Sequence, residues 1–322
     1  MSQYSIYFPV YYSDYSDEDK YQTIEDAENF QSALVKVLAN YQDEGLLNLK
    51  IVLQNSLRGK LRRNKLIQNY IKSNNWKWLC INFDFENPKH ISDPTWGVWE
   101  KIRLLQICAS IARPNMSVQS YVFYTVDGEF IEKLRGIVTN IPNSVAHHLD
   151  QNEQWPLIHS LDIWQTWEWV NNFPSFFRNL SKCKIGRALN AYTQLFHTSF
   201  SIETTVSDFF WSMIALEAIY TDSHTGVNQA LFDKIFLVLG KPTNFHKQIK
   251  EIYNYRSRLL HGQLEIPGKF SYDNDDEDID RHLKLVDSED SSVCLIVATL
   301  QYLVMNNIKE IEFSRKYDLV IK

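Results

Sequence analysis

Arg256 and His261 are the residues whose types and spacing best suit chemistry, and Gly262 follows the histidine directly. A guanidinium is always charged and presents a planar fork of donors that fits a phosphate group. An imidazole changes charge near neutral pH, so it can act as a general acid or base. The pair can therefore stabilise charge and transfer protons at a phosphate ester. Chance alone gives roughly 0.3 pairs at this spacing in such a chain, so the context must support the assignment.

The helix predicted over residues 245–261 places Arg256 in the middle of an apolar stripe that includes Ile252 and Leu259. An isolated charge in such a stripe costs several kcal/mol, so Arg256 needs a partner. A second predicted helix, Val206–Tyr220, carries Glu217 at the edge of its own apolar face. We expect these two side chains to form an ion pair. Such a pair either serves the fold alone or holds Arg256 in place for a ligand.

Gly262 predicts the end of this helix, with His261 as its last residue. The helix dipole at that end favours a cationic imidazole. Five residues of helix turn the side chains of Arg256 and His261 about 140° apart. The two groups can reach one substrate only if the helix end unwinds or if two copies of the chain share a cleft. The geometry therefore favours a dimeric site.

Composition excludes several classes of protein. The chain has 322 residues with 44% hydrophobic and 14% aromatic residues, enough for roughly two domains with real cores. Its 10 glycines are never two or five positions apart, which excludes a phosphate loop and a Rossmann fingerprint. The net charge of −6 means that any contact with nucleic acid needs a local basic patch.

The four cysteines stand far apart, which argues against a zinc ribbon and against a disulfide framework. The N-terminus lacks the pattern of a signal peptide, and the longest apolar run, 293–305, is too short to cross a bilayer. We therefore expect a cytoplasmic protein with no membrane contact.

Residues 1–142 alternate strand-like and helix-like stretches, which predicts a small α/β domain with a sensor or regulatory role. Pro9 confines the first strand to an edge or to an irregular position. The expected strands are 4–12, 46–53, 76–85, 118–126 and 130–139, and the expected helices are 24–42, 57–72 and 96–112.

Residues 143–182 form an expected Trp-rich helical connector, and 183–322 an all-α bundle, so the fold class is α+β overall. The bundle helices are expected at 185–200, 206–220, 229–239, 245–261 and 291–311. Between the last two lies the acidic tract 273–280, with six carboxylates in eight residues, which predicts a solvated loop.

Three segments resemble the HEPN domains, specifically their Apea-like branch from bacterial defence proteins. Residues 213–219, Met-Ile-Ala-Leu-Glu-Ala-Ile, are similar to that family's aliphatic-Ala-Leu-Glu-Ala-aliphatic helix. Residues 253–262 are similar to its Tyr-x-x-Arg-Ser-x-x-x-His-Gly block, and the apolar helix 293–304 to its closing helix. The resemblance covers about residues 180–315 and implies a HEPN-type bundle.

The resemblance implies a metal-independent endoribonuclease without cofactors. Arg256 and His261 are then catalytic in a cleft shared by two protomers, with Glu217 and Ser257 as supporting residues. RNA, possibly tRNA, is the expected substrate, and a toxin-like role in antiviral defence with an operon-encoded partner protein is the expected setting. The alternative is a non-catalytic HEPN module that binds a nucleotide or a protein and has a regulatory or scaffolding role.

Other segments offer weaker hypotheses. Arg258 and the basic stretch that contains Arg58, Arg62 and Arg63 can guide an RNA backbone, although a solvated helix face explains the stretch equally simply. His147, His148 and Asp150 lack nearby Cys or Glu partners for a metal, and Asp84 and Glu86 lack the remaining residues of a metal-dependent nuclease. The tryptophans of 155–169 can stack bases, but we expect them to be packed within the fold.

Overall fold

The computed structural model describes residues 2–11, 24–40, 46–54, 76–85, 94–116, 121–127, 129–135, 139–150, 155–174, 181–196, 206–221, 227–241, 246–266 and 276–313. The chain divides into two units, and each is considered by itself. Unit 1 comprises Met1–Asp150, His159–Glu168 and Phe196–Ile202, and unit 2 comprises Gln151–Ile158, Trp169–Leu195 and Glu203–Lys322. The expected connector, 143–182, is therefore split between the two units. The fold is mixed, with helices and one antiparallel sheet, in agreement with the expected α+β class.

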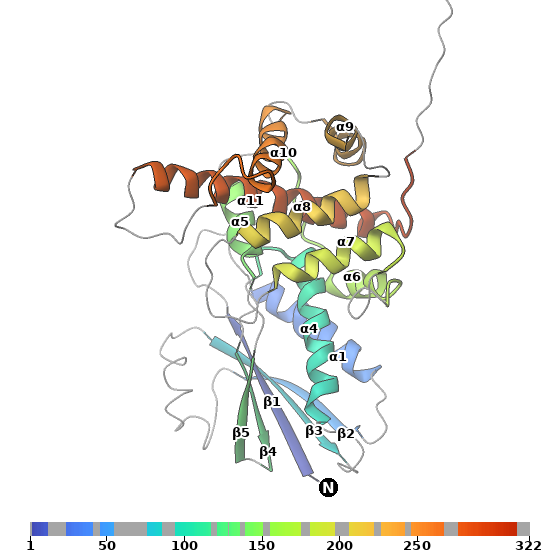
Figure 1. Ribbon diagram of the computed structural model, residues 1–322. Helices are drawn as coiled ribbons and strands as arrows, with labels where there is room; N and C mark the ends of the chain where they lie inside the picture. Colours follow the sequence, from blue (N-terminus) through green and yellow to red (C-terminus); the bar gives the residue numbers. More distant parts are fainter. Residues whose placement is uncertain are drawn as a thin grey trace, which may run out of the picture. The chain divides into compact units, whose positions relative to one another are not determined.

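Unit 1 is built on a five-stranded sheet with the order β2-β3-β1-β4-β5 (Figure 1). Every described strand pair is antiparallel. Its strands are β1 (Ser2–Tyr11), β2 (Leu46–Gln54), β3 (Trp76–Phe85), β4 (Tyr121–Val126) and β5 (Glu129–Arg135). Its helices are α1 (Ile24–Ala39), α4 (Pro94–Ala112) and α5 (Ile141–Asp150), and α6 (Ile163–Val170) begins in it.

The connectivity explains why the strands and helices alternate along the chain. Helix α1 connects β1 to β2 with β3 between them, and α4 connects β3 to β4 with β1 between them. These are two split β-α-β units, the connectivity of a ferredoxin-like sheet, with β5 added at one edge. The expected α/β alternation is present, but it builds an antiparallel sheet with helices packed beside it.

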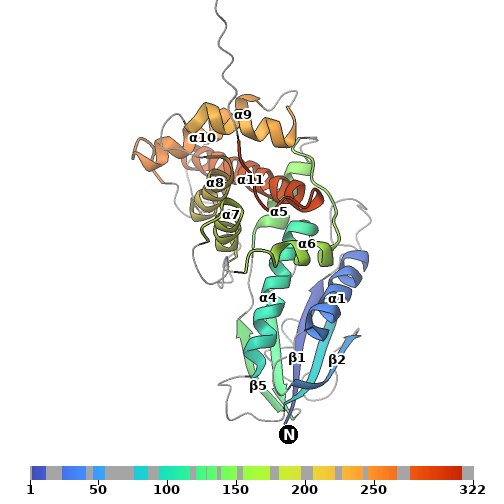
Figure 2. The same ribbon diagram turned by 90° about the vertical axis from the view of Figure 1, so that its right-hand side faces the viewer.

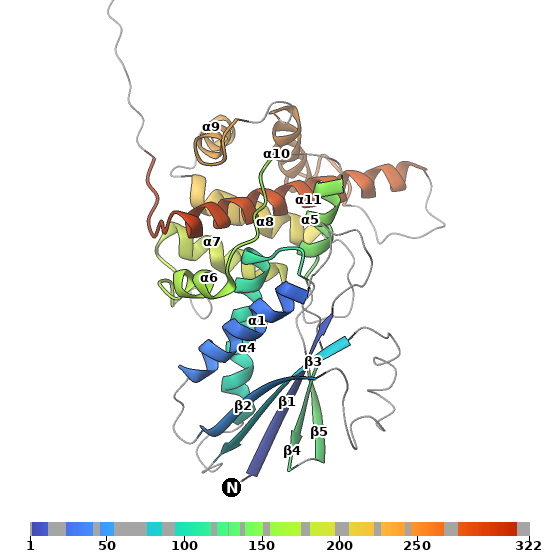
Figure 3. The ribbon, with the colours of Figure 1, turned by 180° about the vertical axis from the view of Figure 1, so that it is seen from behind.

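One face of the sheet is the core of unit 1. Tyr4 and Ile6 of β1 lie opposite Phe83 and Ile81 of β3, and all four side chains are buried. A stripe on α1 is buried with them, at the spacing that one helix face requires. Figures 1 and 3 show α1 and α4 side by side, and contacts join the two helices.

The prediction that β1 is an edge strand is wrong, since β1 lies between β3 and β4. The ladder to β3 runs from Ser2 to Tyr11, but the ladder to β4 covers only Tyr4–Tyr7. Pro9 therefore lies beyond the end of the β4 ladder, where a missing N–H breaks no hydrogen bond on that side. A strand can be central for half its length and an edge for the rest.

In the described part of unit 2, every regular element is a helix. The helices are α7 (Lys184–Tyr192), the short 3₁₀ helix η1 (Thr193–Leu195), α8 (Val206–Tyr220), α9 (Val227–Leu239), α10 (His246–Leu260) and α11 (Asp276–Met305). Figure 2 shows α7 and α8 side by side, and α11 also packs on α8. Two tryptophans are buried here as expected: Trp169 is 3% exposed and donates to the Ile308 carbonyl, and Trp167 of unit 1 is 7% exposed.

Helix α8 is joined to α11 by buried hydroxyl groups as well as by apolar contacts. The Ser212 and Ser292 hydroxyls lie 2.5 Å apart, and the Tyr220 and Thr299 hydroxyls 2.9 Å apart. All four residues are buried, so each hydroxyl needs the partner that it finds here.

The prediction that the acidic tract is a loop is wrong for Asp276 to Asp280, which form the first turns of α11. The reason is electrostatic: the N-terminal end of a helix carries a partial positive charge that stabilises carboxylates. Figures 1 and 3 show these turns extending beyond α8. Residues 273–275 lie outside the described residues.

Candidate active site on helices α8 and α10

Glu217 is the residue around which the site is built. Its Oε2 accepts a hydrogen bond from Arg256 Nη2 at 3.0 Å, and its Oε1 accepts one from the Tyr253 hydroxyl at 2.6 Å. The side chains of Arg256 and Glu217 are 18% and 20% exposed. The predicted ion pair between the two helices is confirmed.

Tyr253 is the partner that sequence reasoning missed. It stands three residues before Arg256, so the two side chains are neighbours on one face of α10. The Arg256 guanidinium carbon lies 5.6 Å from the centre of the Tyr253 ring. The signal for this contact was the i, i+3 spacing together with the need for a second donor to the buried carboxylate.

Arg256 is held on one side and keeps an unused donor on another. Its buried Nε has no hydrogen-bond partner among the described residues. An unpaired donor on a charged, mostly buried group is unusual and is often associated with a functional role. The guanidinium is thus oriented by Glu217 and Tyr253 but not saturated by them.

Burial raises the pKa of the Tyr253 hydroxyl, and the hydrogen bond to Glu217 and its negative charge raise it further. The neutral hydroxyl is therefore favoured in the folded state. Since an unfolded tyrosine ionises near pH 10, this contribution is complete below about pH 10 and is lost as the pH rises above it.

Tyr253→Phe is expected to remove this part of the alkaline destabilisation. Between about pH 10 and 11.5, the free energy of unfolding of the wild type should fall by up to about 1.4 kcal/mol per pH unit more than that of the variant. Urea unfolding at a series of pH values measures the difference. Tyr302→Phe, at a half-buried tyrosine of α11, is the control and should follow the wild type. Parallel curves for wild type and Tyr253→Phe contradict the assignment.

His261 lies at the end of α10 in a Schellman motif. The Gly262 N–H donates to the Leu259 carbonyl at 3.2 Å and the Gln263 N–H to the Arg258 carbonyl at 2.8 Å. Gly262 has a φ of 65°, a conformation that glycine adopts without steric cost. The predicted helix end is confirmed, and it leaves the His261 side chain exposed.

Arg256 and His261 do not contact each other in the described chain. Arg256 faces α8, whereas His261 is exposed where α10 ends, as the 140° estimate requires. Ser257 is half-buried, and its carbonyl accepts the His261 N–H at 3.0 Å. Arg258 is exposed on α10. Leu260, expected in the apolar stripe, is 54% exposed because α10 ends there.

The segment after His261 is tied to the acidic start of α11. Arg281 Nη1 lies 3.2 Å from Glu265 Oε2 and 3.1 Å from Asp278 Oδ1. Its Nη2 also pairs with Glu277. Arg281 thus joins the first turns of α11 to the segment that carries the histidine.

Arg281→Ala is expected to loosen this segment with little effect on global stability, because exposed ion pairs contribute little. Amide hydrogen exchange at 262–265 should become about threefold faster, while exchange in β3 stays unchanged. Lys284→Ala, one turn away and without this ion-pair network, is the control. Unchanged exchange at 262–265 contradicts a restraining role for Arg281.

The remaining candidates from the sequence contribute little to this site. Arg58, Arg62, Arg63 and Glu86 lie outside the described residues. Asp84 accepts a hydrogen bond from Asn48 at 2.8 Å, and His148 is buried. Within the described ranges, no cluster of three His, Cys, Asp or Glu side chains has the arrangement of a metal site. No helix in those ranges has the length and apolar character needed to span a membrane.

Comparisons of the chain with protein-family models, with curated proteins and with solved structures find no match. The assignment of a function therefore depends on the residues and on their geometry.

Proposed function

We propose that this protein is a metal-independent endoribonuclease in which Arg256 and His261 of two protomers line a shared cleft. The observation that supports this most is the state of Arg256: a charged side chain oriented by Glu217 and Tyr253 that retains a buried, unpaired Nε–H. The resemblance of residues 253–262 to the HEPN block is the second support. Because His261 lies on a different side of α10, a cleft between two copies is the arrangement that lets both groups reach one phosphate.

Cleavage of RNA without a metal needs three things: removal of the 2′-OH proton, stabilisation of the pentavalent phosphorane, and protonation of the leaving 5′-oxygen. Histidines from two protomers can perform the two proton transfers. Arg256 can stabilise the negative charge that develops on the phosphorane. The products are a 2′,3′-cyclic phosphate and a 5′-hydroxyl end. DNA is inert in this scheme because it lacks the 2′-OH.

The biological setting belongs to the same proposal. A toxin-like effector of antiviral defence acts in the cytoplasm, where unit 1 senses a trigger or restrains cleavage. An operon-encoded partner protein can deliver that trigger, and tRNA is a suitable substrate. The ferredoxin-like sheet is compatible with a sensing role but does not identify the signal.

A second candidate is a non-catalytic module that binds a nucleotide or a protein. The observation that favours it is that Glu217 already neutralises Arg256 in the absence of a ligand. In that case His261 has no chemical role, and its replacement changes no activity.

The test is incubation of the full chain with tRNA, total RNA and single-stranded DNA of matched length in EDTA. The proposal expects cut RNA with cyclic phosphate ends, intact DNA, and a dimer in equilibrium sedimentation. Cleavage of DNA at the same rate, or full activity in a strict monomer, contradicts it. Absence of RNA cleavage with and without a cellular lysate as a source of activator favours the second candidate.

A further inference from the structure

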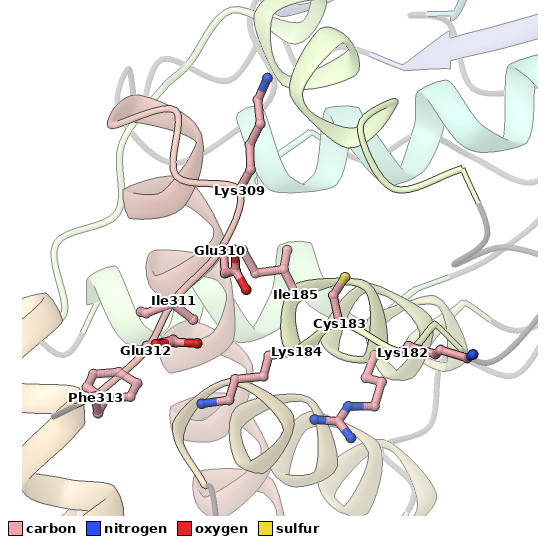
Figure 4. Close-up of a pocket in the computed structure, with 10 residues that line it drawn as sticks. Lys182, Cys183, Lys184, Ile185, Lys309, Glu310, Ile311, Glu312 and Phe313 are labelled. Carbon is pink, nitrogen blue, oxygen red and sulfur yellow. The ribbon is translucent and has the colours of Figure 1, made fainter.

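A pocket of about 420 Å³ lies in unit 2 between the start of α7 and the segment that follows α11 (Figure 4). That volume is within the range of small-molecule sites. None of Glu217, Arg256 and His261 lines the pocket, so it is distinct from the proposed nuclease site. Its lining residues are Lys182, Cys183, Lys184, Ile185, Arg187, Lys309, Glu310, Ile311, Glu312 and Phe313.

The wall formed by α7 is fixed by close packing of its backbone. A Cβ on Gly186 would lie 2.2 Å from Ser181 Oγ, so only glycine fits there without movement of its neighbour. The Gly186 N–H donates to the Cys183 thiol at 3.3 Å, and the Ser181 hydroxyl is also 3.3 Å from this sulfur. The first turn of α7 and the residues before it therefore hold one defined shape, which favours binding by reducing the ordering that a ligand requires.

The charges of the lining are mixed, with an excess of cations. It contains four basic and two acidic side chains, in a chain whose net charge is −6. Lys184 and Arg187 are three residues apart on α7 and so project from one face. Lys184 Nζ lies 5.7 Å from the centre of the Phe313 ring. In Figure 4 Lys184 extends toward Phe313, whereas Lys309 points away from the other labelled residues.

The second wall supplies acceptors and apolar surface. Glu310 and Glu312 lie in the segment after α11, alternating with Ile311 and Phe313. Carboxylates accept hydrogen bonds from hydroxyl and amino groups but repel a bare anion. The pocket thus combines donors for an anion, acceptors for neutral donors, and apolar side chains that a flat ring can contact.

We propose that this pocket binds a nucleoside phosphate. Lys184 and Arg187 hold the phosphate, because a guanidinium and an ammonium one turn apart match its charge and its several acceptors. Glu310 and Glu312 accept from the ribose hydroxyls or from the amino group of the base, and Ile311 and Phe313 pack against the base. The same chemistry is available in a free nucleotide and at the phosphorylated end of an RNA.

Isothermal titration of the full chain tests this with four probes: ADP, inorganic phosphate, and a single-stranded RNA with either a 5′-phosphate or a 5′-hydroxyl. We expect ADP to bind at least tenfold more tightly than inorganic phosphate. Lys184→Ala with Arg187→Ala should weaken ADP binding at least tenfold. The control, Lys50→Ala with Lys241→Ala, removes two exposed lysines outside the pocket and should bind like the wild type.

A second pair of variants tests the acidic wall. Glu310→Gln with Glu312→Gln should tighten inorganic phosphate and reduce the preference for ADP, an effect that loss of folding does not produce. RNA binding that needs the 5′-phosphate identifies an RNA end as the ligand, and ADP binding without such a dependence identifies a free nucleotide. No binding of any probe, or equal weakening in the control pair, overturns the proposal. Because binding alone is measured, this result is independent of whether the protein cleaves RNA.

Discussion

His261→Ala is expected to reduce RNA cleavage by a factor of about 10² to 10⁴, the usual contribution of a general acid or base. The fold should not change, because the side chain is exposed and the helix end depends on backbone bonds and on Gly262. Initial rates with tRNA in EDTA measure the effect, and thermal unfolding of wild type and variant checks the fold. The pH profile of kcat/KM should also lose the limb that belongs to an imidazole.

The matched control is His159→Ala, since His159 is an exposed histidine of unit 1 outside the site. It should cleave at the wild-type rate. A rate within twofold of wild type for His261→Ala excludes general acid–base catalysis by this histidine, and the second candidate function then gains support.

Glu217→Ala is expected to have the largest effect on stability. It leaves the Arg256 charge and the Tyr253 hydroxyl without their common acceptor in a mostly buried position. Loss of one partner from a buried pair is strongly destabilising, so we expect about 2 kcal/mol less free energy of unfolding. Cleavage should fall as well, because Arg256 is no longer oriented. Urea unfolding and initial rates measure the two effects.

Two further variants separate charge from hydrogen bonding. Glu217→Gln keeps an acceptor for Tyr253 but removes the negative charge, so its stability should lie between those of wild type and Glu217→Ala. Glu251→Ala, at an exposed glutamate of α10, should change stability by less than about 0.5 kcal/mol. If Glu217→Ala and Arg256→Ala have additive effects in the double variant, the two residues are not coupled and the proposed positioning is wrong.

Features that depend on local sequence were predicted well. The bounds of β3 and α8 agree with expectation at both ends, because each segment is continuously apolar and bounded by polar residues. The end of α10 at Gly262 was predicted for a reason equally local, the ease with which glycine takes a positive φ. The Glu217–Arg256 pair was predicted from the cost of burying either charge alone.

Features that depend on distant contacts were not predicted. The central position of β1 follows from pairing with β3, which is more than 60 residues away in the chain, and Pro9 alone suggested an edge. The acidic residues of α11 are helical because one turn of carboxylates gains from the dipole of a helix whose remaining turns are buried. The role of Tyr253 needed the position of Glu217 in space, and periodicity did not supply it.

The paired hydroxyls between α8 and α11 have a consequence for the site. The two pairs are eight residues apart on α8 and seven apart on α11, so they act as two pins along the same interface. A slide of one helix past the other by a single turn would unpair four buried hydroxyls at once. Glu217 lies between the pins, at a height along the helix axis that they set. The placement of Arg256 is therefore indexed, through Glu217, by serine, threonine and tyrosine hydroxyls that never approach a substrate.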